Sequence, residues 1–151
     1  MRVVVWITEG TWESCVDAVR GLPATDITLV HVVDPDTLAA VLGAQAGLLG
    51  RALPGAAADA ARRALADTQA ALLDAARARL GRPANAQPRE GRVEREVIAA
   101  CAGADLLVLA RDGDRGRPGP RSIGHHARFV VDHAPCGVLL VWPGSPPTGS
   151  G

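Results

Sequence analysis

Short apolar segments alternate along the chain with longer segments in which apolar residues recur at helical spacing. We expect strands over residues 3–7, 27–33, 84–89, 105–110 and 138–142. We expect helices over 12–20, 57–80, 93–101 and 122–133, with a shorter helix after Asp36. Strands that alternate with helices predict an α/β fold, a doubly wound open five-stranded parallel sheet in the order 3-2-1-4-5 with helices on both faces.

Local signals set the ends and faces of the helices. Thr11 is expected to cap the first helix, and residues 47–55, which contain three glycines, to form a flexible connection before the long one. The charged residues of the long helix should face water. The positions expected to face the sheet are Ala61, Leu65, Thr68, Leu72, Ala75 and Ala76.

The outer strands differ in character. The strand over 84–89 is polar and contains Pro88, which is tolerated at a sheet edge. The last strand is apolar on both faces yet should occupy the opposite edge, and an apolar edge invites pairing with another chain. We therefore predict a homodimer through Val138–Trp142. Residues 1–142 should form one domain, and 143–151 a disordered tail.

Composition excludes several classes of function. All sixteen basic residues are arginines, so a Walker lysine and Schiff-base chemistry are absent. The net charge is zero and aromatic residues are few, which argues against nucleic-acid binding. No apolar run is long enough to span a membrane, so we expect a cytoplasmic protein. The three scattered cysteines should be reduced thiols, and His31 a hydrogen-bonded core residue.

Polar turns follow the first and fourth strands. In the predicted order these strands are neighbours at the switch point, where open α/β sheets bind ligands. Thr8–Thr11 and Ala110–Gly113 should therefore meet at one crevice, with the amino terminus of the last helix, expected near Ser122, beside them.

Five segments carry a resemblance to the universal stress protein family: VVVWITEGT, TLVHVVD, REGRVEREVI, GADLLVLA and SIGHHARFVVDHAPCGVLLV. The resemblance covers Arg2 to Val141. It implies a small cytoplasmic protein, commonly a dimer, and in one branch of the family ATP binding at the crevice described above. In that branch Glu9 would stand near the ribose and the Mg-phosphate region, and the Val32 backbone would meet adenine.

The phosphate loop departs from the family pattern of Gly-x-x-Gly, nine residues and then Gly-Ser or Gly-Thr. Ala110 replaces the first glycine, ten residues separate Gly113 from Gly124, and His125 replaces the hydroxyl residue. Loop arginines could replace missing amide contacts to a triphosphate. The candidate nucleotide-binding residues are Thr8, Glu9, Val32, Ala110, Asp112, Gly113, Gly124, His125 and His126.

Two functions remain open on this sequence. The chain is either an ATP-binding regulatory module of the stress response or a nucleotide-free family member that acts through dimerisation and contacts with an unknown protein partner. We expect no catalytic residue; slow ATP hydrolysis stays open. We expect no metal site, because His125 and His126 are adjacent and point to different sides of a helix.

Overall fold

The computed structural model describes residues 1–37, 39–40, 55–112 and 123–144. Within them one sheet has the order β3-β2-β1-β4-β5, and each neighbouring pair is parallel. The strands are β1 (Arg2–Trp6), β2 (Asp26–Val33), β3 (Asn85–Glu90), β4 (Leu106–Ala110) and β5 (Gly137–Val141). The predicted fold and strand order are confirmed, and each strand ends within one residue of its predicted bounds.

The two most apolar strands lie side by side at the centre of the sheet. Val4 of β1 is opposite Leu107 of β4, and both are buried. A central parallel strand is covered on both faces, so it needs apolar side chains on both. Val5 accordingly packs into the core on one face and Trp6 into the core on the other.

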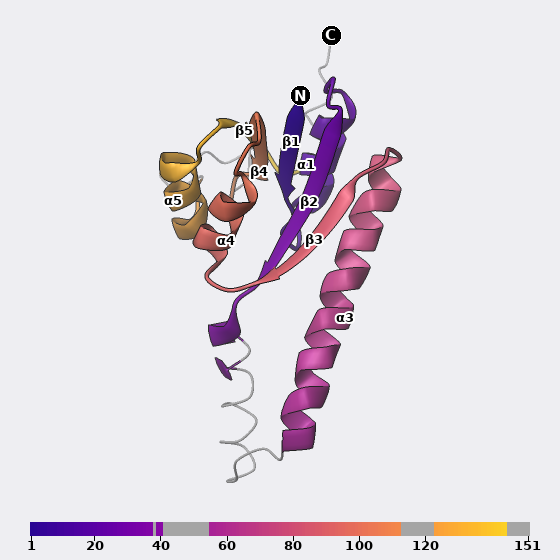
Figure 1. The fold of residues 1–151 in the computed structure, drawn as a ribbon, viewed down its shortest axis with the longest axis vertical. Coiled ribbons are helices and arrows are strands. Elements are labelled where there is room, and N and C mark those ends of the chain that lie inside the picture. Colours follow the sequence, from indigo (N-terminus) through magenta and orange to yellow (C-terminus); the bar gives the residue numbers. More distant parts are fainter. Residues whose placement is uncertain (38, 41–54, 113–122, 145–151) are drawn as a thin grey trace.

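Helices cover both faces of the sheet (Figure 1). The described helices are α1 (Trp12–Arg20), α3 (Gly55–Leu80), α4 (Val93–Ala100) and α5 (His125–His133). α1 and α3 share one core with β1 and β2, whereas α4 and α5 share the other. Residues 35–37 and 39–40 are helical, but the rest of the expected short helix and most of the connection at 47–55 lie outside the described residues.

The buried stripe of α3 differs from the predicted one. Thr68 and Ala75, which were expected to face the sheet, are exposed. The buried positions are Gln69, Leu73, Ala76 and Leu80. The helix is therefore turned so that a polar residue begins its buried face, which the apolar pattern could not show.

Gln69 can be buried because its amide is hydrogen-bonded. Its Nε2 donates to the carbonyl oxygen of His31 at 2.9 Å and to that of Arg89 at 3.1 Å. A buried amide without such partners would cost free energy, whereas a paired one ties α3 to β2 and β3.

The backbone pattern explains why Pro88 is tolerated in β3. The Gly91 N–H donates to the Val33 carbonyl, so alternate residues of β3 direct their backbone groups toward β2. Pro88 lies out of phase with Gly91 and faces the open edge, where no ladder bond is lost. Its predicted place at the margin of the sheet is confirmed.

The opposite edge, β5, ends at Val141, so Trp142 lies just beyond the strand. Four of its five residues are half-buried in the single chain. The Gly144 N–H donates to Ser14 Oγ at 3.0 Å, and residues 145–151 of the predicted tail lie outside the described residues. No helix in the described part of the chain has the length and apolar character needed to cross a membrane.

Candidate functional site

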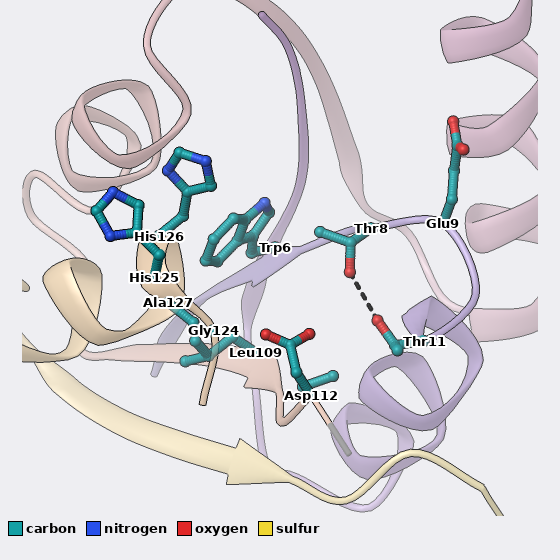
Figure 2. A pocket seen from close by; sticks show the side chains of 11 residues that line it. Trp6, Thr8, Glu9, Thr11, Leu109, Asp112, Gly124, His125, His126 and Ala127 are labelled. Atoms are coloured by element: carbon teal, nitrogen blue, oxygen red, sulfur yellow. Dashed lines mark hydrogen bonds between the residues drawn. The ribbon is translucent and has the colours of Figure 1, made fainter. Parts of the chain in front are cut away.

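A cavity of about 220 Å³ opens at the carboxyl ends of β1 and β4, beside the amino terminus of α5 (Figure 2). Its position matches the crevice predicted from the strand order. The residues that line it are Trp6, Thr8, Glu9, Thr11, Leu109, Ala110, Asp112, Gly124, His125, His126 and Ala127. The structure thus gathers seven of the nine candidate residues into one cavity.

Two candidate residues are not among those that line the cavity. Val32 is a buried residue of β2 and packs in the core on the side of α4 and α5. Gly113 lies outside the described residues, as do Ser122 and all the loop arginines except Arg111. The Arg111 guanidinium lies over the Trp142 ring, 4.8 Å from its centroid, and Arg111 is not among the residues that line the cavity.

Sequence reasoning missed the apolar wall of the cavity. Trp6, Leu109 and Ala127 line it, although the sequence analysis placed them in expected strands or a helix and not among the candidate binding residues. The Trp6 side chain is 6% exposed, and Figure 2 shows its ring between the histidines and Thr8. The signal that could have found Trp6 is its place at the end of β1, where side chains at the switch point face the ligand edge.

The turn after β1 presents a pair of hydroxyl groups. Thr8 Oγ1 and Thr11 Oγ1 are 2.6 Å apart and share a hydrogen bond, which Figure 2 marks. Thr11 is at the N-cap position of α1, but its side chain makes no capping hydrogen bond, so the predicted side-chain cap is wrong. The hydroxyl is engaged by Thr8 instead. Glu9 is exposed, and in Figure 2 its carboxylate points away from the cavity.

The rim opposite this turn is the amino terminus of α5. The helix begins at His125, three residues later than predicted, and Gly124 precedes it in an extended conformation with φ −68° and ψ 168°. No side-chain capping bond is present among the described residues, and the Arg128 N–H makes its first-turn bond to the Gly124 carbonyl at 2.9 Å. The N–H groups before Arg128 therefore have no partner within the helix, as is general at helix amino termini.

Asp112 lies against this helix end. A Cβ atom built on Gly124 would overlap the Asp112 carboxylate and come within 3.2 Å of its Cγ. Figure 2 shows the carboxylate between Gly124 and the Thr8 hydroxyl, directed into the cavity. The absence of a side chain at Gly124 is what allows this close approach.

The two adjacent histidines take different roles. His126 Nδ1 is 2.9 Å from Glu94 Oε2, which links α5 to α4. Hydrogen bonding from its own backbone amide, and then from His126, lowers the pKa of Glu94. The His125 ring lies 5.1 Å from that of His126 at an interplanar angle of 58°. His125 is exposed at the cavity rim and is available to a ligand.

The remaining histidines do not join the site. His133 Nδ1 lies 2.8 Å from the Phe129 carbonyl oxygen in the last turn of α5, as a donor near a helix carboxyl terminus should. His31 was expected to be hydrogen-bonded, but its buried Nδ1 has no hydrogen-bond partner among the residues that the structure describes, so that expectation is wrong for this atom. Burial lowers the pKa of His31, and Glu9 partly opposes this. Among the described residues no group of three or more His, Cys, Asp or Glu side chains could hold a metal ion.

Cys15 and Cys101 are buried, which makes them poor candidates for a nucleophile. All three cysteines are free, and burial raises the pKa of Cys15 and of Cys101 to about 12. Thiols with such pKa values are protonated at neutral pH, and the thiolate is the reactive form. The cavity instead combines an aromatic wall, hydroxyl groups and a helix amino terminus, which is chemistry for binding a ligand.

Comparison with known proteins identifies related folds. The profile of the universal stress protein family matches residues 13–141. Comparison with curated protein sequences gives no significant match. The structure of hypothetical protein MJ0577 superposes with a TM-score of 0.69 at 15% identity, over 96% of this chain and 98% of that one.

Two further similar structures were solved with nucleotides. A universal stress protein in complex with cAMP has a TM-score of 0.52 at 17% identity, over 95% of this chain and 98% of that one. A universal stress family protein from Arabidopsis thaliana with AMP bound has a TM-score of 0.55 at 15% identity, over 99% and 97%. At these identities the likeness shows a common fold.

Proposed function

The chain belongs to the universal stress protein family, and on that premise we propose that it is a regulatory module that binds an adenine nucleotide in the cavity at the switch point. The observation that carries the proposal is the cavity itself, where Trp6 forms one wall and the amino terminus of α5 forms another. An aromatic ring suits a nucleobase, and unpaired helix N–H groups suit a phosphate. The AMP and cAMP bound to two proteins of the same fold support this reading.

Each part of a nucleotide has a matching group in the cavity. The base would lie against Trp6 and Leu109, and the ribose hydroxyls would meet the hydroxyl pair of Thr8 and Thr11. Glu9 would reach the ribose or a phosphate-bound Mg²⁺ only after its side chain turns inward. ATP with Mg²⁺ is the ligand that the resemblance in the sequence implies, and signalling in the cytoplasmic stress response is the role that would follow.

We assign no general base for turnover among the described residues that line the cavity, so we propose binding without catalysis. The test is thermal unfolding with AMP, cAMP, ATP and Mg-ATP. A ligand at a hundred times its dissociation constant should add about 2.7 kcal/mol of stability. Ala110→Leu, which narrows the cavity, should weaken binding about tenfold, whereas the exposed Ala70→Leu on α3 should not. If no adenine nucleotide shifts the midpoint, the proposal is wrong.

A nucleotide-free role through protein contacts is the second candidate, and the β5 edge favours it. We propose that β5 pairs with a second copy of this chain. The Arg111 N–H donates to the Val141 carbonyl, and the Gly137 N–H donates to the Asp105 carbonyl. Alternate residues of a strand face opposite sides, so Val138 and Leu140 direct their backbone groups to the open edge.

This alternation decides which substitution tests the dimer. Leu140→Pro removes an N–H from the open edge and leaves the β4–β5 ladder intact, whereas a proline at Val141 would break the ladder of the single chain. We expect light scattering to report a dimer for the parent and a monomer for Leu140→Pro. Ala86→Pro, at an outward-facing position of β3, is the matched control and should stay dimeric. A parent that is monomeric at micromolar concentration would contradict the proposal.

A further inference from the structure

The position that a phosphate would take at the amino terminus of α5 is already next to an anion of the chain. The Asp112 carboxylate lies so close to Gly124 that a Cβ atom there would overlap it. Gly124 is the N-cap residue, and in the described part of the chain no side chain makes a capping bond there. A helix amino terminus attracts negative charge. Asp112 thus stands where the helix would otherwise present its N–H groups to a ligand phosphate.

The other described residues that line the cavity do not offset this charge. They include a second carboxylate, Glu9, and no arginine. The chain has no lysine, and the nearest described arginine in sequence, Arg111, places its guanidinium over Trp142. Among the described residues that line the cavity, the basic side chains are the two imidazoles of His125 and His126, and His126 is paired with Glu94.

We propose that Asp112 is a specificity-determining residue, which makes the cavity select nucleosides and nucleoside monophosphates over nucleoside triphosphates. The inference rests on the proposed nucleotide-binding function. A monophosphate brings about two negative charges to the helix end, and a triphosphate brings about four, so the repulsion by a fixed carboxylate grows along the series. The carboxylate therefore disfavours a triphosphate more strongly than a monophosphate.

The exposure of Asp112 sets the expected difference in affinity between AMP and ATP. Asp112 is exposed, so water and salt screen its charge, and we expect a difference of about tenfold rather than a complete block. Tenfold in affinity corresponds to about 1.4 kcal/mol. The discrimination should shrink as the salt concentration rises, because screening weakens the repulsion.

The test is calorimetric titration of the full chain with AMP, ADP and ATP, in EDTA and again with Mg²⁺. The variants are Asp112→Asn, which removes the charge and keeps the shape, and Asp132→Asn. Asp132 is an exposed carboxylate on α5 outside the cavity lining, so its variant makes the same change in net charge. In EDTA, Asp112→Asn should tighten ATP binding about tenfold and AMP binding no more than about threefold. Asp132→Asn should leave the ratio of the two affinities unchanged.

The outcomes separate this inference from the function on which it rests. A parent that binds AMP, and binds ATP equally well or better in EDTA, keeps the proposed function and overturns the inference. An equal gain for AMP and ATP in Asp112→Asn overturns it as well. A loss of ATP affinity in that variant with Mg²⁺ would make the carboxylate a metal ligand and would also overturn it. A parent that binds AMP but no detectable ATP, beside an Asp112→Asn variant that binds both, would support the inference. If neither protein binds any nucleotide, the proposed function itself is wrong.

Discussion

Gln69→Glu changes one buried atom of α3 and should strongly destabilise the fold. The Gln69 amide donates to two carbonyl oxygens, of His31 and Arg89, at 2.9 and 3.1 Å. A glutamate of nearly the same shape can donate at most one hydrogen bond there, and only when it is protonated. Loss of one bond costs about 1 kcal/mol. The residue is 8% exposed, so an ionised carboxylate beside two carbonyl oxygens would be poorly hydrated.

The cost of keeping the buried glutamate protonated limits how much free energy of unfolding the substitution can remove. An unfolded glutamate has a pKa of about 4.3, so keeping it neutral at pH 7.5 costs about 4 kcal/mol. Together with the lost hydrogen bond this puts the upper limit of the loss at about 5 kcal/mol; we expect about 3 kcal/mol, because partial hydration of an ionised carboxylate would avoid part of the protonation cost. A pKa that is raised in the folded state reduces stability at pH values above the unfolded pKa, so most of the loss should disappear between pH 7.5 and pH 5.

Urea unfolding at both pH values measures this loss. Ala70→Glu is the matched control, because Ala70 is the next residue of α3 and is exposed. We expect it to change the free energy of unfolding by no more than about 0.5 kcal/mol. Equal effects of the two glutamates at both pH values would refute the reasoning, since they would show that the Gln69 side chain reaches water and that its two hydrogen bonds contribute little.

Three further predictions concern the frame that holds the site. Arg82→Met should lower the free energy of unfolding by about 2–4 kcal/mol in urea, because this half-buried guanidinium donates to one backbone carbonyl at the end of α1 at 3.4 Å and to two in the following turn at 3.0 and 2.5 Å. Arg77→Met, which changes an exposed arginine, should have little effect. Gly81→Ala should cost about 1–2 kcal/mol by the same assay, because Gly81 has a φ of +64°. The parent should lose stability as the pH falls below about 6.5, because burial lowers the pKa of His31 and the unfolded chain then binds the proton more tightly. His31→Leu should remove that part of the loss. If parent and variant lose stability equally between pH 7.5 and 5.5, the prediction is wrong.

The strand order of the sheet could be predicted from the sequence because the central strands are apolar on both faces. The apolar run from Val3 to Ile7 fits only a strand covered by helices on both sides, and the alternation of strands and helices then leaves few topologies. The same reasoning failed on α3, where Gln69 is buried and Thr68 is exposed. The amide is buried because two carbonyl oxygens from separate strands meet it, and sequence spacing on one helix carries no information about them.

The candidate site shows the same limit at the amino terminus of α5. A sequence pattern compares the loop with fixed residue types and spacings, so the departures it identified were Ala110, the ten-residue spacer and His125. The described geometry instead points to Asp112, because the decisive quantity is the distance of a charge from a helix end twelve residues further along the chain. Gly124 permits close approach by any group, and the pattern cannot say whether a ligand phosphate or a carboxylate of the chain comes close. A glycine at a helix amino terminus therefore predicts an anion position, while the ligand that the position selects depends on which charges the fold brings beside it.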